Sequence, residues 1–281
     1  MREDLKRFLS EFEMLGRSTS VAGDLLDFIS RGEFELARLA EMIEQDKLFA
    51  DSVLRLANSP HYRRSDAVTS LKFAVSLLGV WTLRSMAALL LIREIGTLED
   101  RTWNHCLSVA VAAQLHAEIY GDDPALAYST GLIHDFGAIL LANFDPVGYR
   151  AVESYLDNGL TREAQSEYIG AEIEAYGISH PDLGSSALER WGFPEETTDA
   201  VRLHHRESVW MSPAHRALVS GERLVHLERL SPLLWSREIL LPEDVTLSSA
   251  IDRLALFSSR VADFVSIAPP SKLQLPASRF H

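Results

Sequence analysis

The sequence predicts an all-α protein, built as a two-lobed bundle of many helices. Apolar residues recur at helical spacing along nearly the whole chain, as in Leu36, Leu39 and Ile43. No segment shows the clean alternation of apolar and polar residues that indicates a half-buried strand. A capping residue followed by proline predicts three helix starts, at Asp123-Pro124, Asp145-Pro146 and Ser212-Pro213.

The first lobe is predicted to span residues 1–98. Its helices are expected to break near Gly32, at 58–65 and at Gly79, where glycine and polar residues interrupt the apolar pattern. The apolar segments Val53–Ala57 and Leu71–Leu78 should be largely buried as the core of this lobe.

The most apolar stretch, Val68–Ile92, has the length of a membrane span. Lys72 and Arg84 interrupt it and Gly79 divides it, so we interpret it as buried core and expect no membrane insertion. The first sixteen residues are too charged for a secretory signal, and no export is expected.

The second lobe is predicted to span residues 99–230 and to meet the first near Leu98–Trp103. Breaks are expected near Gly121, Gly159, Gly177 and 191–194. Residues 231–281 should hold C-terminal helices and, from Ala268, a loose proline-containing tail that buries little apolar surface.

Composition narrows the classes of function. The chain has 27 Lys and Arg against 40 Asp and Glu, a formal net charge of −13, which disfavours binding to phosphate backbones; no nucleic-acid partner is expected. Cys106 is the single cysteine, which excludes an internal disulfide and favours a reducing compartment, so the cytoplasm is the expected location. We interpret Cys106 as a packed core residue rather than a nucleophile.

Six residues of the second lobe could form a metal site, and nine of the ten histidines follow residue 103. The six candidates are His105, His134, Asp135, His180, His204 and His205. Imidazole and carboxylate together suit a divalent Fe, Mn, Zn, Co or Ni ion, and a helical bundle can direct such side chains into one cavity. One ion, two ions and none remain open, because each histidine alone has a structural interpretation as a half-buried, capping or solvated helix residue.

The order of these residues and their neighbours resembles the HDOD branch of the HD superfamily. The resemblance covers about Thr19 to Leu230 and rests on the runs LFADSVLRLANSPHY, VTSLKFAVSLLGVWTLRSMAALLL, WNHCLSVA, GLIHDFGAILL and HPDLGSSALERWGFPEETTDAVRLHH. It implies an HD-like helical second lobe. It also implies that His105, His134 and Asp135 are metal ligands, with Asp135 bridging two cations.

The same resemblance places His180, His204 and His205 at positions that complete a two-metal site in the related HD-GYP phosphodiesterases. This sequence departs from those enzymes in several ways. Ala138 stands where the enzymes have a lysine, and Arg101 stands where an acidic ligand is usual. The late Asp ligand is missing from the run at 219–222, where only Glu222 could substitute, and no GYP motif follows.

Two hypotheses of function remain. The first is a bacterial signal-transduction output module that acts on a signalling protein partner through protein–protein interaction, with a degenerate metal-hydrolase scaffold. The second is a metal-dependent phosphohydrolase or phosphodiesterase acting on nucleotides or cyclic dinucleotides. The missing lysine and acidic ligands favour the first. A homo-oligomer is compatible with either, and fold likeness alone cannot separate them.

Overall fold

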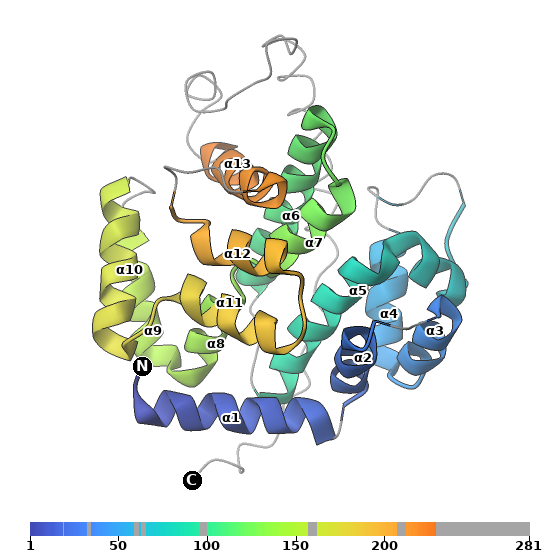
Figure 1. Cartoon of the computed structure of the whole chain (residues 1–281), viewed down its shortest axis with the longest axis horizontal. Helices are drawn as coiled ribbons and strands as arrows, with labels where there is room; N and C mark the ends of the chain where they lie inside the picture. Colours follow the sequence, from blue (N-terminus) through green and yellow to red (C-terminus); the bar gives the residue numbers. More distant parts are fainter. Residues whose placement is uncertain are drawn as a thin grey trace.

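The described residues of the computed structural model are all helical or connecting turns, with no strand among them (Figure 1). These residues are 1–228 without 19, 33–34, 59–61, 63–65, 96–99, 157–161 and 207–211. The first helices are α1 (Glu3–Ser18), α2 (Val21–Ser30), α3 (Leu36–Glu44), α4 (Lys47–Ala57) and α5 (Leu71–Ile95). They are followed by α6 (Asp100–Tyr120), α7 (Pro124–Ile133), α8 (Phe136–Phe144), α9 (Pro146–Glu153), the 3-10 turn η1 (Ser154–Leu156), α10 (Arg162–Tyr176), α11 (His180–Arg190), α12 (Glu195–Leu203) and α13 (Pro213–Glu228). The predicted all-α class is confirmed.

The three helix starts predicted from proline are also confirmed. The side chain of Asp123 accepts hydrogen bonds from the first amides of α7, and Asp145 does the same for α9. Helix α13 begins at Pro213. The proline in each first turn has no amide to leave unpaired, so the start of the helix costs little.

Glycine ends or bends the helices where the sequence predicted breaks. Gly32, Gly121 and Gly177 each adopt a positive φ of 71–77° in the turn after a helix. Gly79 also has a positive φ, 74°, and its backbone is not helical, so it separates two helical pieces within α5, as predicted. Gly159 lies outside the described residues.

Helix α5 lies between the two groups of helices that Figure 1 shows on either side of it. It packs against α2, α3 and α4 on one side and against α7 and α8 on the other. One continuous hydrophobic core extends from Leu5 in α1 to Val225 in α13. The division into lobes at residue 98 stays a prediction, and it falls on residues 96–99, which are not described.

The apolar residues of the two predicted core segments are buried or half-buried, with one exception. Val53, Leu56 and Ala57 are buried in α4, as are Ala74, Val75 and Leu78 in α5. Phe73 is instead 58% exposed, because it lies on the outer face of the first turn of α5.

Two stretches are long and apolar enough to cross a membrane, Leu71–Ile92 and Pro124–Phe144. Their most apolar windows are 67% and 72% buried inside the protein, so both stretches contribute to the core. Cys106 is fully buried, and burial raises the pKa of its thiol, which agrees with a packing role. The predictions for residues 231–281 concern a segment outside the described residues.

Candidate metal centre

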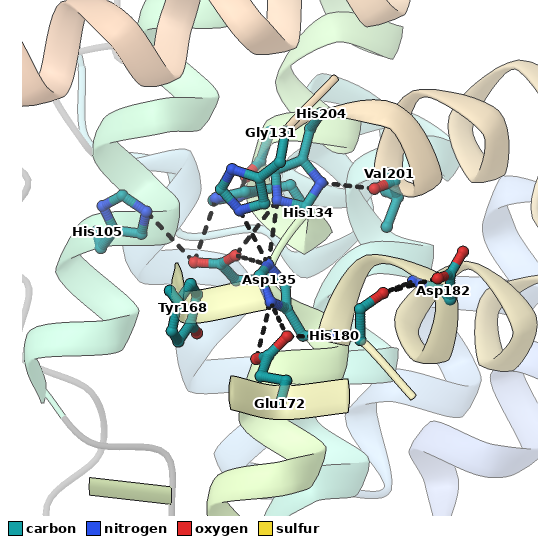
Figure 2. Close-up of polar contacts among 12 residues, drawn as sticks. His105, Gly131, His134, Asp135, Tyr168, Glu172, His180, Asp182, Val201 and His204 are labelled. Atoms are coloured by element: carbon teal, nitrogen blue, oxygen red, sulfur yellow. Dashed lines mark hydrogen bonds and ion pairs between the residues drawn. The ribbon is translucent and has the colours of Figure 1, made fainter. Parts of the chain in front are cut away.

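The six predicted residues come together from four parts of the chain (Figure 2). His105 lies on α6, and His134 and Asp135 form the turn between α7 and α8. His180 is the first residue of α11, while His204 and His205 follow the end of α12. Their ligand atoms form two groups, each within 4.8 Å: His105 with His134 and Asp135, and His180 with His204 and His205.

A close contact between α8 and α11 positions the centre. A Cβ atom on Gly137 would lie 2.0 Å from the main-chain oxygen of His180 and 2.7 Å from the amide nitrogen of Gly184. Only glycine fits there, so the HDFG run allows the start of α11 to approach the start of α8. This contact brings His180 beside Asp135.

The Asp135 carboxylate lies between the two groups. Its Oδ2 is 3.3 Å from Nε2 of both His105 and His134. Its Oδ1 is 3.7 Å from Nε2 of His180 and 3.8 Å from Nε2 of His204. One oxygen therefore faces each group, as a carboxylate that bridges two cations would.

Hydrogen bonds at Nδ1 fix the tautomer of three histidines. His134 Nδ1 donates to the carbonyl of Gly131 at 2.8 Å, and His204 Nδ1 donates to the carbonyl of Val201 at 2.5 Å. His180 Nδ1 lies 2.9 Å from both carboxylate oxygens of Glu172. Because these partners accept hydrogen bonds, we assign a proton to Nδ1 in each ring, and Nε2 is the nitrogen that faces the centre and would bind a cation once its own proton is lost.

The Nε2 atoms converge more closely than neutral rings alone would favour. His180 Nε2 is 3.3 Å from His204 Nε2 and 3.1 Å from His205 Nε2. His134 Nε2 is buried without a hydrogen-bond partner. Lone pairs directed at one another repel unless a proton or a cation lies between them. The donor set therefore fits a divalent metal ion, and nitrogen with carboxylate oxygen suits Fe, Mn, Zn, Co or Ni.

Burial and neighbouring charge shift the pKa values of the site histidines in opposite directions. Burial lowers the pKa of His204 to about 4, in spite of the Glu222 charge, and burial beside His204 holds the pKa of His205 well below its usual value. Burial also disfavours the charged form of His134, but Asp135 and Glu222 outweigh it and raise its pKa to about 9. The neighbouring histidines hold the pKa of Asp135 well below its usual range despite burial, so its carboxylate is ionised.

Two further acidic residues lie beside the six predicted site residues. Glu222 of α13 is buried, and its charge favours the protonated forms of His134, His180 and His204, so the run at 219–222 does place an acid near the centre. Glu172 of α10 is fully buried against His180, and the sequence analysis missed it. Its signal was a charged residue within an otherwise aromatic i, i+4 stripe, between Tyr168 and Tyr176.

Two residues that depart from the HD-GYP pattern lie in the helices around the centre. Ala138 lies half-buried in α8 against the core, and Arg101 lies on α6 one turn before His105. The side chain of Arg101 is outside the described residues. The main charges that act on the described site residues come from carboxylates and histidines.

The sequence pattern of the HDOD domain matches residues 15–207. The chain belongs to the HDOD domain family. The match begins in α1 and ends just after α12, so it includes all six predicted residues. A curated relative, an uncharacterised protein of Treponema pallidum, is 21% identical over 184 residues; that match covers 63% of this chain but only 35% of the relative.

Solved structures share this HDOD fold. A Shewanella amazonensis chain, provisionally described as a phosphohydrolase, has a TM-score of 0.69 at 21% identity and covers 92% of this chain and 97% of its own. A Marinobacter aquaeolei chain, provisionally described as a signal transduction protein, has a TM-score of 0.62 at 22% identity, and the match covers 88% of this chain and 57% of the Marinobacter chain. An HDOD protein of unknown function from Geobacter sulfurreducens has a TM-score of 0.58 at 22% identity, and the match covers 92% of this chain and 95% of the Geobacter chain. At these identities the likeness establishes the fold alone.

Proposed function

We propose that this HDOD chain is a bacterial signal-transduction module that acts through contacts with a signalling protein, and that its metal centre serves structure or regulation. The observation that carries the proposal is the closed, cation-poor centre. His134, His180 and His204 are at most 2% exposed, and the side chains of His105 and Asp135 are only 17% and 18% exposed. A substrate phosphate would have little access to the ligands.

The charge around the centre supports the same conclusion. Phosphoryl transfer places negative charge on the equatorial oxygens, which metals and a positioned cation must stabilise. Ala138 stands where the related phosphodiesterases carry a lysine. Asp135 and Glu222 instead add negative charge, so an approaching phosphate would be repelled wherever bound metal did not compensate.

The proposed partner is a signalling protein in the cytoplasm. The net charge of −13 suits a partner with a basic surface, because complementary charge accelerates encounter and selects partners. The provisional description of the Marinobacter protein as a signal transduction protein also favours this role.

The second candidate is a metal-dependent phosphohydrolase, and the position of Asp135 favours it. Each of its carboxylate oxygens faces a separate group of histidines, and Glu222 adds an acid near the group that lacks one. Bound metal would supply Lewis-acid polarisation of a phosphate and a more acidic water. The chain itself would contribute the ligands and the exclusion of bulk water.

Turnover separates the two candidates. The intact protein, reconstituted with Mn²⁺ or Fe²⁺, is assayed against cyclic dinucleotides, nucleotides and phosphomonoesters, with Asp135→Ala as control. The signalling proposal predicts bound metal and turnover no higher than that of the control. Robust turnover that disappears in Asp135→Ala would overturn it in favour of the hydrolase.

A further inference from the structure

The Glu172 carboxyl group lies inside the protein with no solvent exposure. Its Oε1 accepts a hydrogen bond from the Tyr149 hydroxyl at 2.8 Å, and its Oε2 accepts one from the main-chain amide of His180 at 2.8 Å. Both oxygens lie 2.9 Å from His180 Nδ1. A buried carboxyl group is costly unless its oxygens are paired, and these contacts pair both of them.

The sequence of α10 places this carboxyl group. Tyr168, Glu172 and Tyr176 follow at four-residue intervals, so they share one face of the helix, and all three are buried. The Tyr149 hydroxyl, from α9, lies 2.5 Å from the Tyr168 hydroxyl. Because Tyr149 donates its proton to Glu172, Tyr168 donates to Tyr149. The hydroxyls thus form a directed chain that ends on Glu172.

His180 is held at two points by the same side chain. The main-chain contact fixes where α11 begins, and the Nδ1 contact fixes the rotation of the ring (Figure 2). His134 and His204 have main-chain carbonyls at Nδ1, whereas His180 has a carboxyl group. A carboxylate at this position orients a ligating imidazole and makes its other nitrogen a stronger donor.

We propose that Glu172 is a positioning residue of the metal centre, which holds His180 with Nδ1 protonated and Nε2 directed at the cation, and that Tyr149 holds Glu172 in turn. The proposal rests on the metal centre of the proposed function. It extends the ligand shell to a buried Tyr168–Tyr149–Glu172–His180 chain that links α9, α10 and α11.

Glu172→Gln tests the proposal with little change of shape. Glutamine keeps one acceptor oxygen where Glu172 has two, and the main-chain amide of His180 and the Tyr149 hydroxyl compete with Nδ1 for it. The amide NH₂ cannot accept a proton from Nδ1, so part of the His180 population should switch to the tautomer with Nε2 protonated, which cannot bind metal. Long-range ¹⁵N–¹H NMR of the metal-free protein reports this switch. We expect the Kd for Zn²⁺, measured by competition with a chromophoric chelator, to rise roughly 10–100-fold.

Glu174→Gln is the matched control, because Glu174 is an exposed glutamate on the same helix and makes the same change of charge. Its tautomers and Zn²⁺ affinity should equal those of the unchanged protein. Tyr149→Phe removes one donor to Glu172 and should weaken Zn²⁺ binding less than Glu172→Gln while the His180 tautomer persists. If Glu172→Gln fails to fold, Tyr149→Phe decides the proposal. An unchanged Kd for Zn²⁺ in Tyr149→Phe would contradict it.

The outcomes separate this proposal from the proposed function. An unchanged His180 tautomer and a Zn²⁺ Kd within twofold of the starting value in folded Glu172→Gln would overturn the positioning role. If the unchanged protein binds no Zn²⁺, the metal centre of the proposed function fails. The NMR measurement on metal-free protein still decides in that case whether Glu172 sets the His180 tautomer.

Discussion

Replacing Gly137 by alanine should both destabilise the protein and weaken metal binding. The added Cβ would lie 2.0 Å from the His180 carbonyl oxygen, whereas ordinary van der Waals contact begins near 3.4 Å. The starts of α8 and α11 would have to separate by about 1.4 Å, and both sides of the contact are main chain, which yields little.

Overpacking of this kind typically costs about 1–3 kcal/mol, and the main-chain contact places Gly137→Ala at the upper end. For a chain of this size, a loss of about 3 kcal/mol corresponds to a fall in Tm of roughly 6–12 °C. Because His180 would move away from Asp135, Zn²⁺ affinity should fall as well. Differential scanning calorimetry and the chelator competition assay measure the two effects.

Gly170→Ala is the control for this experiment. Gly170 is exposed in α10, and an added Cβ would meet no atom within 4 Å. Alanine in an open helical position should raise stability by up to about 1 kcal/mol. A Gly137→Ala variant with the Tm and the metal affinity of the unchanged protein would refute the close α8–α11 contact as the feature that positions His180.

Two further predictions concern the core and a buried histidine. Leu56→Asp should lower the free energy of unfolding in urea by at least about 4 kcal/mol, because Leu56 is 5% exposed and the new charge would be buried. Phe73→Asp, at a 58% exposed position, should lower it by under about 1 kcal/mol. Similar losses in the two variants would contradict the core assignment. Burial and Arg216 lower the pKa of His116 from 6.5 to about 4, so the unfolded chain binds its proton first and stability should fall by up to about 3 kcal/mol as the pH drops from 6.5 to 4. His116→Phe should flatten that part of a Tm–pH profile, and an unaltered profile would assign the loss to other groups.

Local patterns in the sequence were sufficient for most of the fold. Helical periodicity, proline starts and glycine breaks depend on neighbours a few residues apart, and these were confirmed. Gly79 is one of these breaks, because its non-helical backbone separates two helical pieces within α5. The exposure of Phe73 was not predictable in this way, since it depends on which neighbouring helix covers the first turn of α5.

The candidate site was predictable as far as its residue types are distinctive. Histidines beside Asp135, in the order shared with the HDOD family, predicted the six residues that converge. Glu172 was missed because its place between Tyr168 and Tyr176 indicates only a buried face of α10, whereas its role depends on α10 packing beside the start of α11. The bridging position of Asp135 depends in the same way on the absence of a side chain at Gly137.

The most direct test of the metal centre is the metal content of purified protein after incubation with Mn²⁺, Fe²⁺ or Zn²⁺ and removal of free ions, compared with that of Asp135→Ala. Asp135 faces both groups of histidines, so its loss should reduce one or two bound ions per chain to none while far-UV circular dichroism stays unchanged. Metal-free unchanged protein, or equal metal content in a folded Asp135→Ala variant, would contradict the account.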